Sequence, residues 1–94
     1  MTQTEVNPKE FRKVQEKKKK SHVLVVINDD FNTFPYVILL LIKVCGHTRI
    51  QAEQCANIIH YKGKCAVKYG EFEKLNDMRR KLVDAGLRAV VEKS

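Results

Sequence analysis

The sequence contains no tryptophan, and none of its apolar runs approaches the roughly 18 residues that a membrane-spanning helix requires. The longest such run, Tyr36 to Ile42, has the length of a buried segment in a globular domain. The N-terminal residues are polar and lack the apolar core of a signal peptide. These absences argue against a membrane protein, and we expect a cytoplasmic one.

Cysteine is scarce, and no two cysteines form a Cys-x-x-Cys pair. Only Cys45, Cys55 and Cys65 are present, an odd number at scattered positions, which argues against a disulfide framework. Pairing Cys45 with His47, or Cys55 with His60, gives no known zinc-ligand spacing. We therefore expect three small buried thiols, no metal site and no cofactor.

The chain is short and its positive charge is unevenly distributed. Its 94 residues suffice for one domain with a modest core. The net charge is +7, and residues 1–20 hold seven Lys/Arg and three Glu, so +4. The run Lys17 to Lys20 indicates binding to nucleic acid or to an acidic protein surface, or else a solvated arm. We expect residues 1–21 to be a disordered basic extension and residues 22–94 to be the core domain.

The core sequence alternates between strand and helix patterns. Strands are expected at 22–27, 64–69 and 87–91, and helices at about 34–45, 48–60 and 71–85. The order is β-α-α-β-α-β. It predicts an α+β fold in which a small three-stranded antiparallel sheet carries three helices on one face.

The helix ends carry specific signals. Thr33 is the expected N-cap of the first helix, and Pro35 suits its first turn. Gly46 is the expected left-handed C-cap. Thr48 and Gln51 match a capping box for the second helix. The first helix is apolar nearly all round, so we expect it to be covered on most faces.

Periodicity also predicts which side chains face the core. On the second strand we expect a buried side formed by Cys65, Val67 and Tyr69. Gly86 is expected to cap the third helix, and the inward residues of that helix are expected to be Phe72, Leu75, Met78, Leu82 and Val83.

The most unusual stretch is Asn28-Asp29-Asp30, directly after a β-branched strand. Two adjacent carboxylates repel each other, and a bound cation would offset that repulsion. The alternative is a plain Asx turn between strand and helix. His60, near the end of the second helix, can accept a hydrogen bond when neutral or can interact with the helix dipole.

Two blocks carry a resemblance to a known family: Val-x-Ile-Asn-Asp-Asp-Phe, followed by an apolar helix, and His-Tyr-Lys-Gly-Lys after the second helix. Together they resemble the ClpS family, bacterial adaptors that pass N-degron substrates to a Clp AAA+ protease. The resemblance extends from about His22 to Lys93. It implies that Asn28, Asp30 and His60 hold the substrate α-amino group and that Asn32 contacts the ligand backbone. From the residues themselves, we expect Asp30, with Asp29 as a further candidate, to supply the negative charge directly or through water.

The resemblance also implies a hydrophobic pocket and a partner surface. The pocket walls would be Phe34, Val37, Ala56 and Ile59, with contributions from Ile27 and Leu87. The family usually has Met at the positions of Phe34 and Ala56. Glu71 and Lys74 are the candidates for contact with the unfoldase.

The implied partners are the N-terminal domain of a ClpA-like or ClpC-like unfoldase and substrates that begin with Leu, Phe, Tyr or Trp. We expect a monomer that binds neither membrane nor nucleic acid. We also expect no enzyme activity, because no Ser or Cys nucleophile is placed with the Asp, Asn and His residues. The alternative is a ribosome-associated or RNA-binding α+β module, which the lysine run favours and Asp29-Asp30 oppose.

Overall fold

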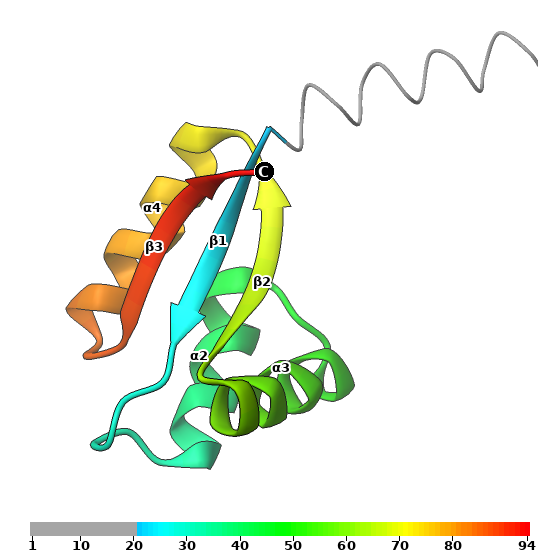
Figure 1. The fold of residues 1–94 in the computed structure, drawn as a ribbon, viewed down its shortest axis with the longest axis vertical. Helices are drawn as coiled ribbons and strands as arrows, with labels where there is room; N and C mark the ends of the chain where they lie inside the picture. The colour runs from blue at the N-terminus through cyan, green and yellow to red at the C-terminus, as the bar shows by residue number, and fades with distance from the viewer. Residues whose placement is uncertain (1–20) are drawn as a thin grey trace, which may run out of the picture.

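The computed structural model describes residues 21–94, and the predicted fold is confirmed there. The expected N-terminal extension lies outside these residues except for Ser21. The element order is the expected one (Figure 1): β1 (His22–Ile27), α2 (Phe34–Cys45), α3 (Arg49–Lys62), β2 (Lys64–Gly70), α4 (Phe72–Asp84) and β3 (Arg88–Lys93).

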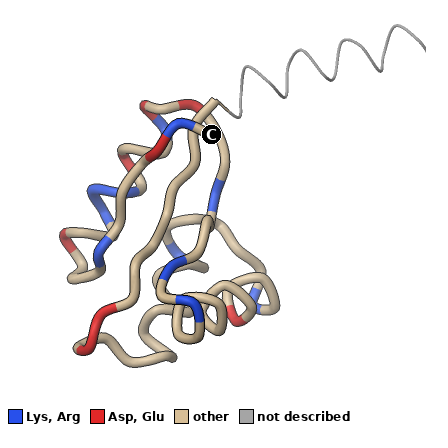
Figure 2. The backbone as a smooth tube through the Cα atoms, viewed as in Figure 1, with Lys and Arg blue, Asp and Glu red and all other residues tan. Residues whose placement is uncertain are grey.

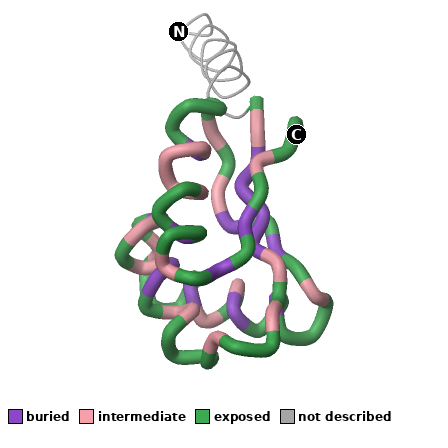
Figure 3. Tube along the Cα trace, turned by 90° about the vertical axis from the view of Figure 1, so that its left-hand side faces the viewer, coloured by how far each residue is buried: buried purple, intermediate pink, exposed green. Residues whose placement is uncertain are grey.

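The three strands form one antiparallel sheet in the order β2-β1-β3. The central strand β1 supplies Leu24 and Val26 to a single core that also contains buried residues of all three helices. That shared core places the helices on one face of the sheet. In Figure 3 the buried segments follow the strands and the inward-facing turns of the helices. Burial of each such aliphatic side chain stabilises the fold by about 1.5–3 kcal/mol.

The predicted caps are present at both ends of α2 and at the start of α3. Thr33 Oγ1 accepts a hydrogen bond from the Tyr36 backbone N–H at 3.3 Å. Gly46 ends α2 with a φ of 72°, and Thr48 and Gln51 form the reciprocal capping box. These caps satisfy backbone groups that have no partner within a helix, and so they fix where α2 begins and ends and where α3 begins.

Helix α2 is less covered than we expected. Only Leu40, Leu41 and Cys45 are buried, whereas Leu39 is half-exposed. Tyr36, Leu39 and Lys43 follow one another at helical spacing on the outer side, and all three are exposed. Among residues 21–94, the sheet and the other helices cover mainly the inner side, and on the outer side the Tyr36 hydroxyl reaches the Ala85 carbonyl, so the prediction of a helix enclosed on most faces is wrong.

The expected burial of Tyr69 is also wrong, because β2 carries a bulge. Val25 pairs with Ala66 whereas Leu24 pairs with Lys68, so Val67 is the extra residue of the β2 strand. An extra residue reverses the alternation of side chains beyond it. Tyr69 is therefore 53% exposed, while Cys65 and Val67 are buried as predicted.

Helix α4 buries a narrower stripe than the sequence predicted. Leu75 and Leu82 are buried and Met78 packs against the core, but Phe72 and Val83 are exposed. Phe72 lies in the first turn, where its ring meets the edge of His22 at a centroid distance of 5.4 Å. The C-cap is Ala85, and Gly86 follows it at a φ of 104°.

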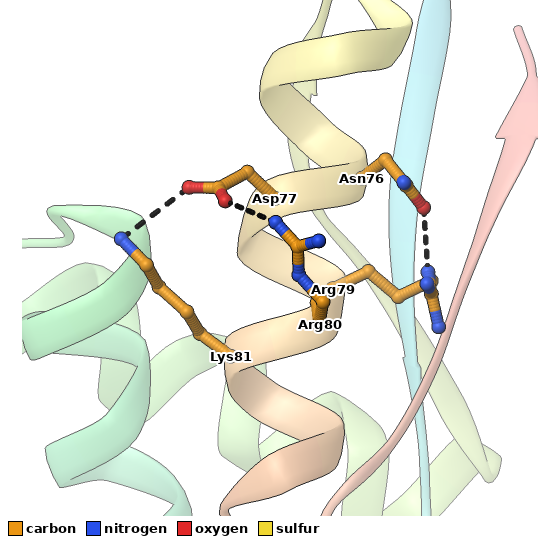
Figure 4. A network of polar contacts seen from close by, with 5 residues as sticks. All are labelled: Asn76, Asp77, Arg79, Arg80 and Lys81. Atoms are coloured by element: carbon orange, nitrogen blue, oxygen red, sulfur yellow. Dashed lines mark hydrogen bonds and ion pairs between the residues drawn. The ribbon is translucent and has the colours of Figure 1, made fainter.

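The outer face of α4 is charged (Figure 4). Asp77 binds Arg80 at 2.8 Å and Lys81 at 3.3 Å, and Asn76 accepts a hydrogen bond from Arg79. Pairs at these helical spacings contribute little to stability here, because the charges are exposed and the solvent screens them. Throughout residues 21–94, no helix is both long enough and apolar enough to cross a bilayer.

Candidate functional site

A cavity of about 470 Å³ opens where the loop after β1 meets α2 and α3. Its volume falls within the range of small-molecule sites, about 300–1,000 Å³. The sequence predicted all nine lining residues as site residues: Asn28, Asp29, Asp30, Asn32, Phe34, Val37, Ala56, Ile59 and His60.

The cavity has an apolar floor and a polar rim. Ala56 and Ile59 on α3 are buried, and Val37 on α2 is half-buried. Phe34 stands three residues before Val37, and Ala56 three before Ile59, so each helix presents one turn of one face to the cavity. The small side chain of Ala56 leaves room between the two helices.

Ile27 and Leu87 do not line this cavity. They border an adjoining void of about 10 Å³, which shares lining residues with the cavity and holds at most one water molecule. Leu87 is part of the buried core beneath the loop. The structure therefore places these two expected wall residues beside the cavity but not in its lining.

Asp29 organises the loop. Its Oδ1 accepts hydrogen bonds from the backbone N–H groups of Phe31 and Asn32, each at 2.8 Å. Its Oδ2 accepts a further bond from Asn32 Nδ2, also at 2.8 Å. The Asx turn considered as an alternative is thus present at Asp29, within a loop that also lines the cavity.

The ionised form of Asp29 is favoured by these contacts. Partial burial raises the pKa of the Asp29 carboxyl, but the hydrogen bonds from Asn32 and Phe31, together with the nearby Arg88 guanidinium, outweigh that effect and lower the pKa from its usual value. Asp29 is therefore an anion whose oxygens are already occupied by its own loop.

The other rim residues are not engaged in this way. Within residues 21–94, the side chains of Asn28, Asp30 and His60 make no hydrogen bond and no ion pair, and Asn28 and Asp30 lie in the acidic loop between β1 and α2 (Figure 2). The His60 ring contacts Tyr61 edge-on at a centroid distance of 5.3 Å. His60 also lies in the last turn of α3, as the helix-dipole alternative requires. An amide, a carboxylate and an imidazole therefore remain free at the cavity mouth.

Glu71 and Lys74 lie away from the cavity. Glu71 is the N-cap of α4 but makes no side-chain cap hydrogen bond, and both residues are exposed. In Figure 1 the start of α4 lies at the opposite end of the sheet from the loop after β1. The two predicted surfaces are therefore separate.

The cysteines are not arranged as a metal site. Across residues 21–94, no three His, Cys, Asp or Glu side chains are grouped so as to ligate a metal ion. Cys45 and Cys65 are buried as predicted, and Cys55 is half-buried. Burial raises the pKa of the Cys45 thiol to about 11 and that of Cys65 to about 12.

Sequence reasoning missed the contacts that hold the site in place. Tyr36 Oη donates to the Ala85 carbonyl at 2.6 Å, and Asn32 Nδ2 donates to the Gly86 carbonyl at 2.9 Å. The signal for the first was available, because a tyrosine hydroxyl at the start of an apolar helix usually has a polar partner. Its partner, 49 residues away, could not be identified from the sequence.

Comparisons with known proteins identify the family to which the chain is similar. The profile of the family described as ATP-dependent Clp protease adaptor protein ClpS matches residues 17–90. The chain is 35% identical over 83 residues to the ATP-dependent Clp protease adapter protein ClpS of Thermosynechococcus vestitus, covering 87% of this chain and 88% of that protein. It is 31% identical over 84 residues to the protein of the same name from Rhodococcus opacus, covering 89% and 75%.

A solved structure shares the fold. Agrobacterium tumefaciens ClpS2 bound to L-phenylalaninamide superposes with a TM-score of 0.76 at 18% sequence identity, covering 81% of this chain and 99% of that one. At that identity the likeness concerns the fold alone. The family profile and the bacterial relatives carry the assignment, and the chain belongs to the ClpS family of Clp protease adaptors.

Proposed function

We propose that the cavity binds the first residue of a substrate protein and that the chain delivers this substrate to a Clp unfoldase. Asn28, Asp30 and His60 would hold the α-amino group. The first side chain would enter the space above Phe34, Val37, Ala56 and Ile59. The observation that carries the proposal is the set of three unengaged polar side chains at the mouth of a cavity with an apolar floor.

The chemistry of these groups fits a protein N-terminus. An α-ammonium carries three N–H donors and one positive charge, so it needs several acceptors and a nearby anion. The Asn28 amide oxygen and a neutral His60 nitrogen are acceptors, and Asp30 supplies both an acceptor and the charge. An acetylated N-terminus has lost the charge and two donors, so the same site would discriminate against it.

Asp29 and Asn32 take different roles in this proposal. Asp29 is occupied by its own loop and contributes its charge at a distance. Both amide hydrogens of Asn32 are used, so the acceptor free for a ligand N–H is its Oδ1. Asn32 would contact the ligand backbone in this way.

The bound molecule in the Agrobacterium neighbour supports the proposal. L-phenylalaninamide has a free α-amino group and an aromatic side chain, the two features for which this cavity has a polar rim and an apolar floor. We infer the same class of ligand here: substrates that begin with Leu, Phe, Tyr or Trp. Residues branched at Cβ would place a methyl group against the cavity mouth.

The proposed role is binding without catalysis. The free groups at the mouth are acceptors, and the cavity lining contains neither a Ser nor a Cys side chain that could act as nucleophile. Delivery would use the separate surface at Glu71 and Lys74 to contact the N-terminal domain of a ClpA-like or ClpC-like unfoldase. The adaptor would act as a monomer in the cytoplasm, with its protease.

A binding measurement with matched peptides tests the proposal. A fluorescent peptide that begins with Leu or Phe should bind, and the N-acetylated peptide should not. Asn28→Ala or His60→Ala should weaken binding by about tenfold or more, since each removes a hydrogen bond to a charged group. His22→Ala, at the far end of β1, is a control that leaves the cavity unchanged.

Equal affinity for free and acetylated peptides would overturn the proposal. A single-stranded RNA oligonucleotide in the same assay addresses the alternative function. RNA binding without peptide binding would favour an RNA-binding module, although the carboxylates at the cavity mouth repel phosphate.

A further inference from the structure

The turn between α4 and β3 accepts two hydrogen bonds from the other side of the cavity. Tyr36 Oη donates to the carbonyl of Ala85 at 2.6 Å, and Asn32 Nδ2 donates to the carbonyl of Gly86 at 2.9 Å. Ala85 is the C-cap of α4, so these consecutive carbonyls lie at the end of a helix, where carbonyl groups have no N–H donor within the helix. One donor comes from α2 and the other from the loop before it.

The second donor connects the turn to the Asx turn of the loop. Asn32 gives one amide hydrogen to Gly86 and the other to Asp29 Oδ2. Asp29 in turn accepts the backbone N–H groups of Phe31 and Asn32. A continuous chain of hydrogen bonds thus runs from the α4–β3 turn to the residue between Asn28 and Asp30.

Tyr36 fixes the other end of the same loop. Its backbone N–H donates to Thr33 Oγ1 at 3.3 Å, which starts α2, and its hydroxyl reaches Ala85. It stands between Phe34 and Val37, both of which line the cavity, yet it does not line the cavity itself. Its hydroxyl can therefore influence ligand binding only through the position of the loop and of the first turn of α2.

We propose that Tyr36 is a positioning residue for ligand binding, which acts with Asn32 to hold the loop of residues 28–32 against the Ala85–Gly86 turn. For the ligand, this inference rests on the proposed function. A loop already held in its binding arrangement loses less conformational freedom when a ligand arrives, and affinity rises accordingly. Asn28 and Asp30 flank Asp29, so their placement depends on this attachment.

Tyr36→Phe tests the inference because it removes the hydroxyl and keeps the ring. Tyr69→Phe is the matched control, since the Tyr69 hydroxyl has no hydrogen-bond partner within residues 21–94 and lies outside the cavity lining. Amide hydrogen exchange at Phe31 and Asn32 reports the loop without any ligand. Exchange at Leu24 and Leu82 reports the core, and affinity for a Phe-initiated peptide reports binding.

In Tyr36→Phe, exchange at Phe31 and Asn32 should accelerate by about threefold to tenfold, the range expected for the loss of one hydrogen bond, while exchange at Leu24 and Leu82 stays unchanged. Peptide affinity should weaken by a similar factor. Tyr69→Phe should match the wild-type protein in every measurement.

Unchanged exchange at Phe31 and Asn32 would overturn the inference, and so would an equal acceleration at Leu24 and Leu82, which would indicate a contribution to global stability alone. Faster loop exchange with unchanged affinity in a protein that binds the peptide would likewise overturn it. If the wild-type protein binds no peptide, the proposed function fails, and loop exchange in Tyr36→Phe still decides whether the hydroxyl fixes the loop.

Discussion

Asn32 donates to Asp29 through both its backbone N–H and its side-chain amide, and the two donor–acceptor distances are 2.8 Å each. This pairing separates the roles of two adjacent carboxylates. Asp29 is committed to the loop, whereas Asp30 has no partner among the described residues and lines the cavity. The repulsion between them is offset at Asp29 by three donors and by Arg88.

Asp29→Asn should destabilise the protein at neutral pH by about 1 kcal/mol, the net value of a typical hydrogen bond, because an amide nitrogen cannot accept from Asn32. The pKa of Asp29 is lowered in the folded state. The stability due to its ionised form is therefore fully present above the usual Asp value of 3.8 and is lost as the pH falls through the lower folded pKa. Thermal unfolding at pH 7 and at pH 2.5 measures the difference.

Asp30→Asn is the control, since it removes the same charge from the next residue without removing a hydrogen bond. It should leave the free energy of unfolding nearly unchanged and weaken peptide binding. If Asp30→Asn destabilised the fold as much as Asp29→Asn, the two carboxylates would not be separated as the structure indicates.

A second prediction concerns the surface at the start of α4. Glu71→Ala and Lys74→Ala should weaken binding to the N-terminal domain of the cognate unfoldase. Exposed charges act mainly on the association rate, so the loss of affinity should depend on the salt concentration. Glu71 makes no cap hydrogen bond, so its removal should not unfold α4. Fluorescence anisotropy with the labelled adaptor measures the affinity.

Peptide affinity should be the same in these variants as in the wild-type protein, since the cavity lies at the other end of the sheet. Glu73→Ala, on the same turn, is the charge-matched control. A parallel loss of peptide and unfoldase binding would contradict the separation of the two surfaces.

The cavity lining was expected from the resemblance to the family, whose two sequence blocks are local. The Asn28–Asp30 stretch and the His60 block each lie at the end of one element. The resemblance implied Phe34, Val37, Ala56 and Ile59 as wall residues, and the i, i+3 spacing of each pair allows both to face one cavity. The resemblance assigned the α-amino group to Asp30, but the sequence did not show that Asp29 is held by its own loop, because that depends on where the Asn32 side chain points.

The errors arose where tertiary structure overrides periodicity. A single extra residue in β2 places Tyr69 on the exposed side, and the sequence Ala66-Val67-Lys68 carries no signal that predicts a bulge. The resemblance implied Leu87 as a contributor to the cavity wall, but the folded chain places it beneath the loop, in the core. The bond from Tyr36 to Ala85 joins positions whose proximity only the folded chain establishes.

The cysteines give a third prediction. A thiol reacts as its thiolate, and with a pKa of about 11 for Cys45 and about 12 for Cys65, at most about one part in a thousand is ionised at pH 8. Iodoacetamide at pH 8 should therefore label half-buried Cys55 first and leave the other two unmodified in the native protein. Peptide mapping by mass spectrometry, before and after denaturation, measures this order. Rapid labelling of Cys45 or Cys65 in the native state would show that the core opens on that timescale.

The last prediction concerns two cavity residues, Phe34 and Ala56, at whose positions the family resemblance led us to expect Met. Both line the same cavity, Phe34 from the first turn of α2 and Ala56 from the floor on α3. Ala56→Met should fill part of the space and weaken binding most for peptides that begin with Phe or Trp, because overpacking typically costs about 1–3 kcal/mol.

Phe34→Met in the same chain should restore much of that affinity, since the smaller side chain returns volume to the cavity mouth. The double-mutant cycle should show a coupling of about 0.5–3 kcal/mol, as is usual for residues that share a cavity. Peptides that begin with Leu provide the control, because their smaller side chain should be less sensitive to either change. Additive effects on the Phe and Trp peptides would mean that Phe34 and Ala56 do not contact the same ligand side chain, and that the first residue of the substrate binds elsewhere on the cavity wall.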